Sequence, residues 1–108
     1  MTQYQGKNVL LEPRADKEIS KLPKPVRESF DKLFALLHKS GSLSYPQARK
    51  LSSYDLFEIR VKRGNIYRCL YCYHKNQIVI LSAFEKKRQK TPIKEIQKAL
   101  QRKNNLEI

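Results

Sequence analysis

The segment 56–92 constrains the fold most strongly, because three apolar runs of strand length follow one another in it with only short polar turns between them. We expect strands over 56–62, 66–73 and 77–85, with turns at 63–65 and 74–76. Turns this short join antiparallel neighbours, so the three strands form a meander. The last run is the most apolar, which favours a central place in the sheet.

The first of these strands has one apolar and one charged face, because side chains alternate along a strand. Phe57, Ile59 and Val61 share one face, while Glu58, Arg60 and Lys62 share the other. Arg60 and Lys62 would stand roughly 6–7 Å apart along the strand, and Arg68 can join them from the next strand. Such a face can hold a phosphate. It can equally be a solvated face in which Glu58 pairs locally with a cation.

The rest of the chain predicts helices around this sheet. We expect a strand at 7–11, helices over 14–22 and 26–39 separated by Pro23 and Pro25, and a long connection over 41–54. Thr91 and Pro92 resemble a helix start, with the hydroxyl as the cap and proline in the first position, and residues 101–108 should fray. The predicted class is α+β: an N-terminal strand and a two-helix hairpin packed on a mainly antiparallel four-stranded sheet, followed by a C-terminal helix. Residues 1–108 form one domain.

The charge of the chain favours a polyanionic partner. There are 23 Lys and Arg residues against 10 Asp and Glu, a formal net charge of +13. A field of that sign concentrates polyanions, with nucleic acid ahead of an acidic protein. A basic cluster, Lys86, Lys87, Arg88 and Lys90, lies between the last strand and the positive end of the next helix. Repulsion there is relieved when an anion binds.

Several kinds of site are excluded by the sequence. Cys69 and Cys72 would point to opposite faces of a strand and lack a second ligand pair, so no metal site is predicted. No phosphate-binding glycine loop, Ser-His-Asp set or cofactor motif is present. A nuclease of this kind would act on RNA, whose 2′-hydroxyl can attack the adjacent phosphate without a metal. Tyr67, Tyr71 and Tyr73 could stack on bases, but the sheet core is the favoured place for them.

The sequence also predicts where the protein acts. No apolar run reaches the ~20 residues of a membrane-spanning helix, so no membrane partner is expected. The N-terminus lacks an apolar segment of signal-peptide length. We therefore expect a cytoplasmic protein with two free thiols.

Particular residues in this order of elements resemble those of the RelE/ParE toxin superfamily, and most of all its HigB-like, phage-derived Gp49-like branch. The resemblance spans about residues 9–102. It rests on the runs Leu56-Phe57-Glu58-Ile59-Arg60 and Ile66-Tyr67-Arg68, and on the more specific pattern F-x-K-K-x-Q-K-T-P over residues 84–92.

The resemblance implies the toxin of a type II toxin–antitoxin pair that cleaves mRNA on the ribosome and is neutralised by a helix-turn-helix antitoxin. By motif match, Arg60 and Arg68 would grip the scissile phosphate. Lys86, Lys87 and Lys90 would stabilise charge or contact rRNA, with Lys62 as a further member of the set. Arg88, from the basic cluster, is a further candidate for binding RNA phosphates.

This chain departs from the RelE pattern at two positions. Glu58 stands where that pattern has a lysine, so Glu58 either acts as the base or pairs with Arg60. Ile93 falls near the place of a late tyrosine, which leaves the acid unassigned. Some superfamily members act on DNA gyrase instead. A ParE-like gyrase inhibitor, or a basic protein-binding module, is therefore the alternative.

Overall fold

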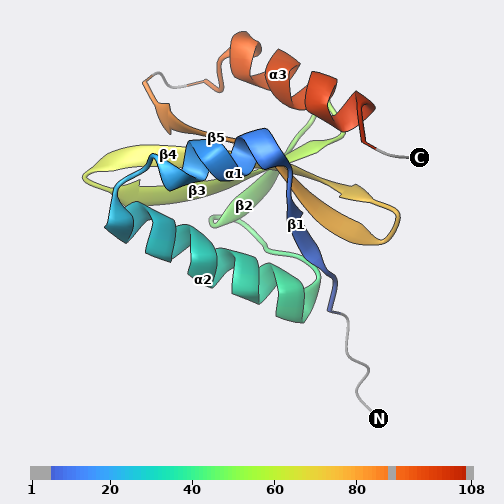
Figure 1. Ribbon diagram of the computed structural model, residues 1–108, viewed down its shortest axis with the longest axis horizontal. Coiled ribbons are helices and arrows are strands. Elements are labelled where there is room, and N and C mark those ends of the chain that lie inside the picture. Colours follow the sequence, from blue (N-terminus) through green and yellow to red (C-terminus); the bar gives the residue numbers. More distant parts are fainter. Residues whose placement is uncertain (1–5, 88–89, 107–108) are drawn as a thin grey trace.

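A five-stranded sheet forms the centre of the computed structural model, which describes residues 6–87 and 90–106 (Figure 1). The strands lie in the order β1-β5-β4-β3-β2. β1 runs parallel to β5, and all other neighbours are antiparallel. The strands are β1 (Val9–Leu11), β2 (Ala48–Leu51), β3 (Leu56–Arg63), β4 (Asn65–His74) and β5 (Gln77–Lys86).

Three helices cover the two faces of this sheet. They are α1 (Pro13–Ser20), α2 (Lys24–Ser40) and α3 (Ile93–Asn104). Phe30, Phe34 and Leu37 of α2 pack with Ile59 and Tyr71 of the sheet in one apolar core. Ile96 and Ala99 of α3 pack with residues of the opposite face, among them Leu70 and Leu81, in a second core. The chain therefore builds three layers, with α3 on one side of the sheet and the α1–α2 pair on the other (Figure 1).

The predicted meander is confirmed, since β3, β4 and β5 are successive antiparallel strands. Lys75 and Asn76 both have positive φ values, 50° and 62°, as a two-residue hairpin turn requires. Gly64 has a φ of 73° in the turn between β3 and β4. β5, the most apolar run, is flanked by β1 and β4, so its interior position is confirmed.

The strand count differs from the prediction, because the connection over 41–54 contains β2. Ala48 and Leu51 are buried while Arg49 and Lys50 are exposed, which is not the alternation of a typical strand. β2 is defined by its pairing with β3, where Ala48 lies opposite Ile59. This contact is made only in the folded chain, so local sequence carried no signal for it.

Two expectations about α3 were wrong. The helix continues to Asn104 rather than fraying after residue 100, because Arg102 is buried against the rest of the protein. Pro92 occupies the N-cap position, and Thr91 does not cap the helix. The Thr91 hydroxyl is instead bonded to charged side chains of the sheet. At the end of α2, Gly41 takes the left-handed conformation, with φ of 80°, that suits glycine at a helix C-terminus.

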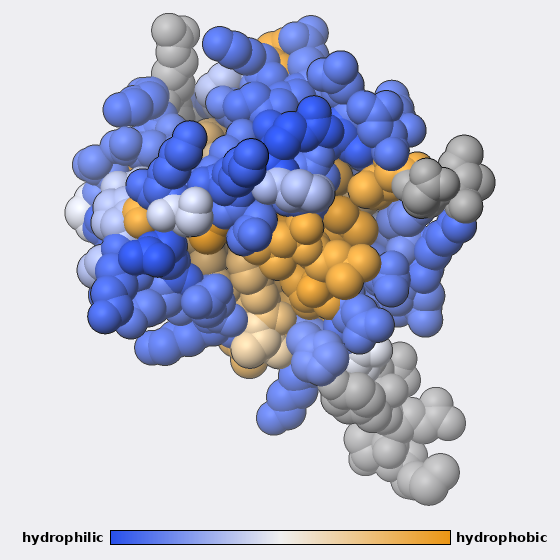
Figure 2. All heavy atoms as spheres, in the orientation of Figure 1, coloured by the Kyte–Doolittle hydropathy of each residue, from blue (hydrophilic) through white to orange (hydrophobic). Residues whose placement is uncertain are grey.

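The surface seen in Figure 2 is mostly hydrophilic, with an apolar area between α2 and α3, over β1 and the β4–β5 hairpin. The chain is shallowly hollowed at this side, where a pocket of about 360 Å³ is lined by Leu10, Leu11, Val79 and Leu106, among others. Leu10 is 45% exposed there.

An ion pair between the buried Arg102 and the partly buried Glu18 joins α3 to α1 across the open edge of β5. Two nitrogens of Arg102 each donate to a carboxylate oxygen of Glu18, both at 2.9 Å. The same guanidinium donates to the Leu81 carbonyl at 2.8 Å, and Glu18 accepts from the Ala83 N–H at 3.1 Å. β1 covers β5 only over Ile78–Ile80, so these side chains satisfy the edge that β1 leaves open.

The same contacts set the ionisation of Glu18. Burial raises the pKa of this carboxyl group, but the hydrogen bonds from Arg102 and Ala83 outweigh burial and hold the pKa below its ordinary value.

We expect Arg102→Ala to lower the free energy of unfolding by about 1.5–3 kcal/mol, because it leaves the partly buried Glu18 carboxylate without its main hydrogen-bond partner. Urea denaturation at neutral pH measures the change. Lys98→Ala is the matched control: this more exposed lysine also pairs with Glu18, and its loss should cost less than about 1 kcal/mol. Equal effects of the two substitutions would contradict the assigned role of Arg102.

Candidate nucleic-acid interface

A basic pocket of about 210 Å³ opens on the face of the sheet that also carries α3, near the β2 edge. One carboxylate and four cationic side chains line it, and an exposed loop closes one side. The lining residues are Tyr45, Pro46, Ala48, Arg49, Glu58, Arg60, Arg68 and Lys86.

The pairing of β3 with β4 places two arginines at the centre of this pocket. Arg60 lies directly opposite Arg68 in the register. Arg60 is exposed, whereas the Arg68 side chain is only 4% exposed. Directly opposed like charges destabilise a sheet, so this pair works against folding in the absence of an anion. The predicted charged face, with Glu58, Arg60 and Arg68 together, is confirmed.

A buried network behind the pocket holds Arg68 in place. One Arg68 nitrogen donates to Glu58 at 3.0 Å and to the Thr91 hydroxyl at 2.8 Å. Thr91 in turn donates to the same Glu58 oxygen. Glu58 is 2% exposed, and its other oxygen accepts from Arg49 at 3.1 Å. In the part of the chain that the structure describes, Glu58 thus pairs with Arg49 and Arg68 and not with its strand neighbour Arg60.

Arg49 and Thr91 are members of the site that sequence reasoning did not assign to it. Arg49 reaches the pocket from β2, and its side chain is half exposed even though it is bonded to Glu58. Thr91 was assigned to a helix cap. The only local signal for either was the basic character of the 41–54 connection around Arg49 and Lys50.

Lys86, at the end of β5, brings a fourth cation to the pocket. It is half-buried and lies one strand away from Arg68. Partial removal from water, and then the positive charges of Arg68 and Arg60, lower the pKa of its ammonium group below the ordinary value. Glu58 opposes this change, but its effect is smaller.

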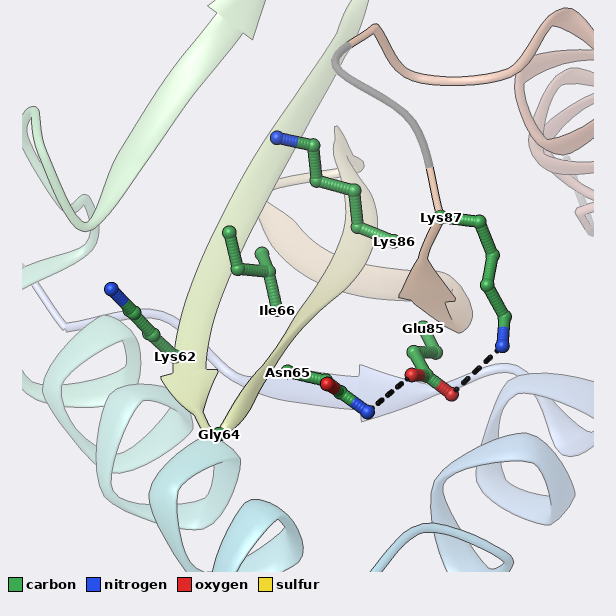
Figure 3. A pocket seen from close by; sticks show the side chains of 7 residues that line it. All are labelled: Lys62, Gly64, Asn65, Ile66, Glu85, Lys86 and Lys87. Carbon is green, nitrogen blue, oxygen red and sulfur yellow. Dashed lines mark hydrogen bonds and ion pairs between the residues drawn. The ribbon is translucent and has the colours of Figure 1, made fainter.

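Not all of the predicted cations converge here. Lys62, Lys86 and Lys87 line a neighbouring open pocket of about 680 Å³, and within it the Lys87 side chain points away from that of Lys86 (Figure 3). The Lys87 ammonium pairs with Glu85 at 3.4 Å, and Asn65 donates to the same carboxylate. Lys90 lies in a third pocket, of about 540 Å³, beside α3. Arg88 falls outside the described residues.

The remaining candidates from the sequence lie in the core. Tyr67 and Tyr71 are buried with residues of α2, so the core position expected for them is confirmed. Cys69 and Cys72 are buried free thiols in opposite cores. Burial raises the pKa of Cys72 to about 11, and that of Cys69 is raised as well. Across residues 6–87 and 90–106, no group of His, Cys, Asp and Glu side chains is arranged to hold a metal ion.

This arrangement is suited to binding a phosphate diester. The guanidinium groups of Arg49, Arg60 and Arg68 supply planar donors for oxygen atoms, and the Lys86 ammonium adds a point charge. Because Glu58 and Thr91 hold Arg68, the site need not reorganise when charge builds on a bound phosphate.

Comparisons with known proteins bear on both the fold and the family. The family described as phage-derived protein Gp49-like (DUF891) matches residues 17–104. A comparison with curated protein sequences finds no match. No helix in the described ranges has both the length and the apolar character needed to cross a membrane.

Solved structures of RelE toxins share the fold. A mutant of the E. coli toxin RelE in the free state matches with a TM-score of 0.67 and 21% identity, covering 90% of this chain and 97% of that one. RelE in the RelB–RelE complex of Methanococcus jannaschii matches at 0.60 and 20% identity, over 70% and 88%. The RelBE2 toxin–antitoxin complex of Mycobacterium tuberculosis matches at 0.57 and 21% identity, over 75% and 92%.

The family match covers most of the chain, and the sheet with its three helices has the same α+β architecture as RelE. The resemblance to the Gp49-like branch is therefore confirmed: the chain belongs to the phage-derived Gp49-like family, and it shares its fold with RelE toxins.

Proposed function

We propose that this protein is the toxin of a type II toxin–antitoxin pair and cleaves mRNA on the ribosome without a metal ion. The observation that carries the proposal is the convergence of Arg49, Arg60, Arg68 and Lys86 on one small pocket. The fold shared with RelE toxins and the Gp49-like family membership support it.

In the proposed reaction, the RNA itself supplies the nucleophile. The 2′-hydroxyl loses its proton to solvent water as its oxygen attacks the adjacent phosphorus. The bond from phosphorus to the 5′ oxygen breaks, that oxygen takes up a proton, and a 2′,3′-cyclic phosphate forms. Negative charge grows on the non-bridging oxygens, which Arg60 and Arg68, two arginines that line the same pocket, would bind. Held by its buried network, Arg68 meets this charge in a fixed orientation.

Lys86 is the residue we assign as the proton donor to the leaving 5′ oxygen. Its lowered pKa makes the ammonium group a stronger acid than an ordinary lysine. Glu58 is the positioning residue for Arg68, rather than the base, because both of its oxygens are already bonded within the protein. Lys62, Lys87, Arg88 and Lys90 would contact flanking mRNA or rRNA.

The partners follow from this assignment. RelE structures that match this chain include complexes with an antitoxin, and we propose that a small antitoxin likewise binds and neutralises this protein. Because its target is the ribosome, the protein acts in the cytoplasm.

We expect Arg60→Ala and Arg68→Ala to reduce mRNA cleavage by about 10²- to 10³-fold each, because each removes a donor to the developing charge. Induced expression tests for growth arrest, and mapping of RNA 5′ ends in a translating extract tests for cleavage. Lys32→Ala on the outer face of α2 removes an equal charge far from the pocket and should behave like the parent.

The proposal is wrong if both folded arginine variants arrest growth as well as the parent. Intact mRNA together with falling DNA supercoiling activity would instead indicate a gyrase inhibitor. Circular dichroism of each variant is needed, because Arg68 is buried with Glu58.

The pKa of Lys86 provides a second test. We expect Arg60→Gln and Arg49→Gln to raise this pKa, because each removes a positive charge that disfavours the ammonium form. NMR titration of the lysine side-chain carbons measures it in the absence of RNA. Lys24→Gln, at the start of α2, should leave the Lys86 titration unchanged.

The sign of the pH dependence follows. A proton donor must be protonated, so cleavage falls as pH rises through the pKa of Lys86, and the fall comes at lower pH than for an ordinary lysine. Unchanged titration in both arginine variants would remove the basis for assigning Lys86 as the acid.

A further inference from the structure

One aromatic side chain at the rim of the basic pocket is not accounted for by folding. Tyr45 is 80% exposed, the most exposed of the large hydrophobic side chains that the structure places at the surface. An apolar ring left in water adds little to stability. Tyr45 lines the same pocket as Arg60, Arg68 and Lys86, so its ring can contact a ligand that these cations bind.

The loop that carries Tyr45 is fastened to the site. The Arg60 N–H donates to the Gln47 carbonyl at 3.1 Å, and the Ala48 N–H donates to the Ser44 carbonyl at 3.1 Å. These bonds bracket Tyr45 and tie its loop to the strand that carries Arg60. The ring is thus presented from an ordered segment, and binding need not order the loop first.

The basic surface extends beyond the central pocket on both sides. Arg49 is shared with the pocket beside α3, which also contains Lys50 and Lys90. Lys86 is shared with the open pocket that contains Lys62 and is shown in Figure 3. The three pockets are therefore joined at Arg49 and Lys86, and together they form one trough lined by cations.

We propose that Tyr45 stacks on an unpaired base of a single-stranded RNA, next to the phosphate that Arg49, Arg60 and Lys86 hold. The inference rests on the proposed function and names the form in which the RNA binds. A trough of cations beside an exposed aromatic ring is the combination that single-strand binding proteins use, since charges follow the backbone and rings receive the bases. An acidic peptide would need the cations but not the ring.

Binding to two seven-nucleotide RNAs tests the inference. Both carry a 5′ fluorescein and the same phosphates, but one has bases and the other is abasic throughout. We expect Tyr45→Ala to weaken binding of the RNA with bases by about tenfold, the order of one lost base–aromatic stack. Binding of the abasic RNA should not change. Tyr45→Phe and Tyr45→Trp keep the ring and should retain the parent affinity, measured by fluorescence anisotropy.

Salt dependence separates stacking from charge. Tyr45→Ala should leave the slope of log affinity against log salt unchanged, whereas Arg60→Ala should reduce it by about 0.7, the loss of one phosphate contact on a single strand. Tyr45 is so exposed that its replacement should not unfold the protein, and thermal unfolding of the variant checks this.

The outcomes are distinguishable. If Tyr45→Ala binds both RNAs like the parent while Arg60→Ala binds weakly, the stacking inference is wrong and the phosphate site stands. If the parent binds neither RNA, both the inference and the proposed function lose their basis. If polyglutamate competes as well as RNA and Tyr45→Ala has no effect, the trough binds an acidic protein and the inference is overturned.

Discussion

Glu58 is the buried carboxylate on which the arrangement of the basic face depends. It accepts hydrogen bonds from Arg49 of β2, Arg68 of β4 and Thr91, the residue two positions before α3. Four separate parts of the chain thus meet at one side chain that is 2% exposed. Charges taken out of water must be paired and hydrogen-bonded, and breaking such a pair costs about 3–5 kcal/mol. The position of Arg68 is therefore determined by folding and not by the ligand.

The cations around this carboxylate repel one another, which disfavours the folded state. Arg60 of β3 lies directly opposite Arg68 of the neighbouring strand β4. The positive charges of both arginines lower the pKa of Lys86. Glu58 supplies a single negative charge against these groups. A phosphate bound among these cations would reduce the repulsion between them. Charges that folding has already brought together can stabilise negative charge that develops in a reaction without a further rearrangement.

Arg102 shows that burial and charge alone do not mark a functional residue. It is as deeply buried as Arg68, and it also pairs with a carboxylate. Both nitrogens that bond Glu18 lie between α1, α3 and the edge of β5, and Arg102 does not line any of the basic pockets described above. Arg102 and its partner Glu18 supply hydrogen bonds to backbone groups of β5 beyond the segment that β1 covers. The two arginines differ in their surroundings, because Arg68 lines a basic pocket with other cations and Arg102 does not. Only the tertiary structure shows this difference.

The sequence by itself determined the meander, the apolar stripe of α2 and the charged face of β3, because these follow from the period of side chains along one element. Alternation placed Glu58 and Arg60 on one face, and the short turn at 63–65 allowed Arg68 of the next strand to join them. The tertiary structure decided the rest: that β2 pairs with β3, that Arg49 and Tyr45 reach the pocket, and that Lys87 turns to Glu85 while Lys86 turns to the arginines. The bond from Thr91 to Glu58 joins residues 33 positions apart. No local pattern encodes such a contact, because its geometry exists only once strands and helix have packed.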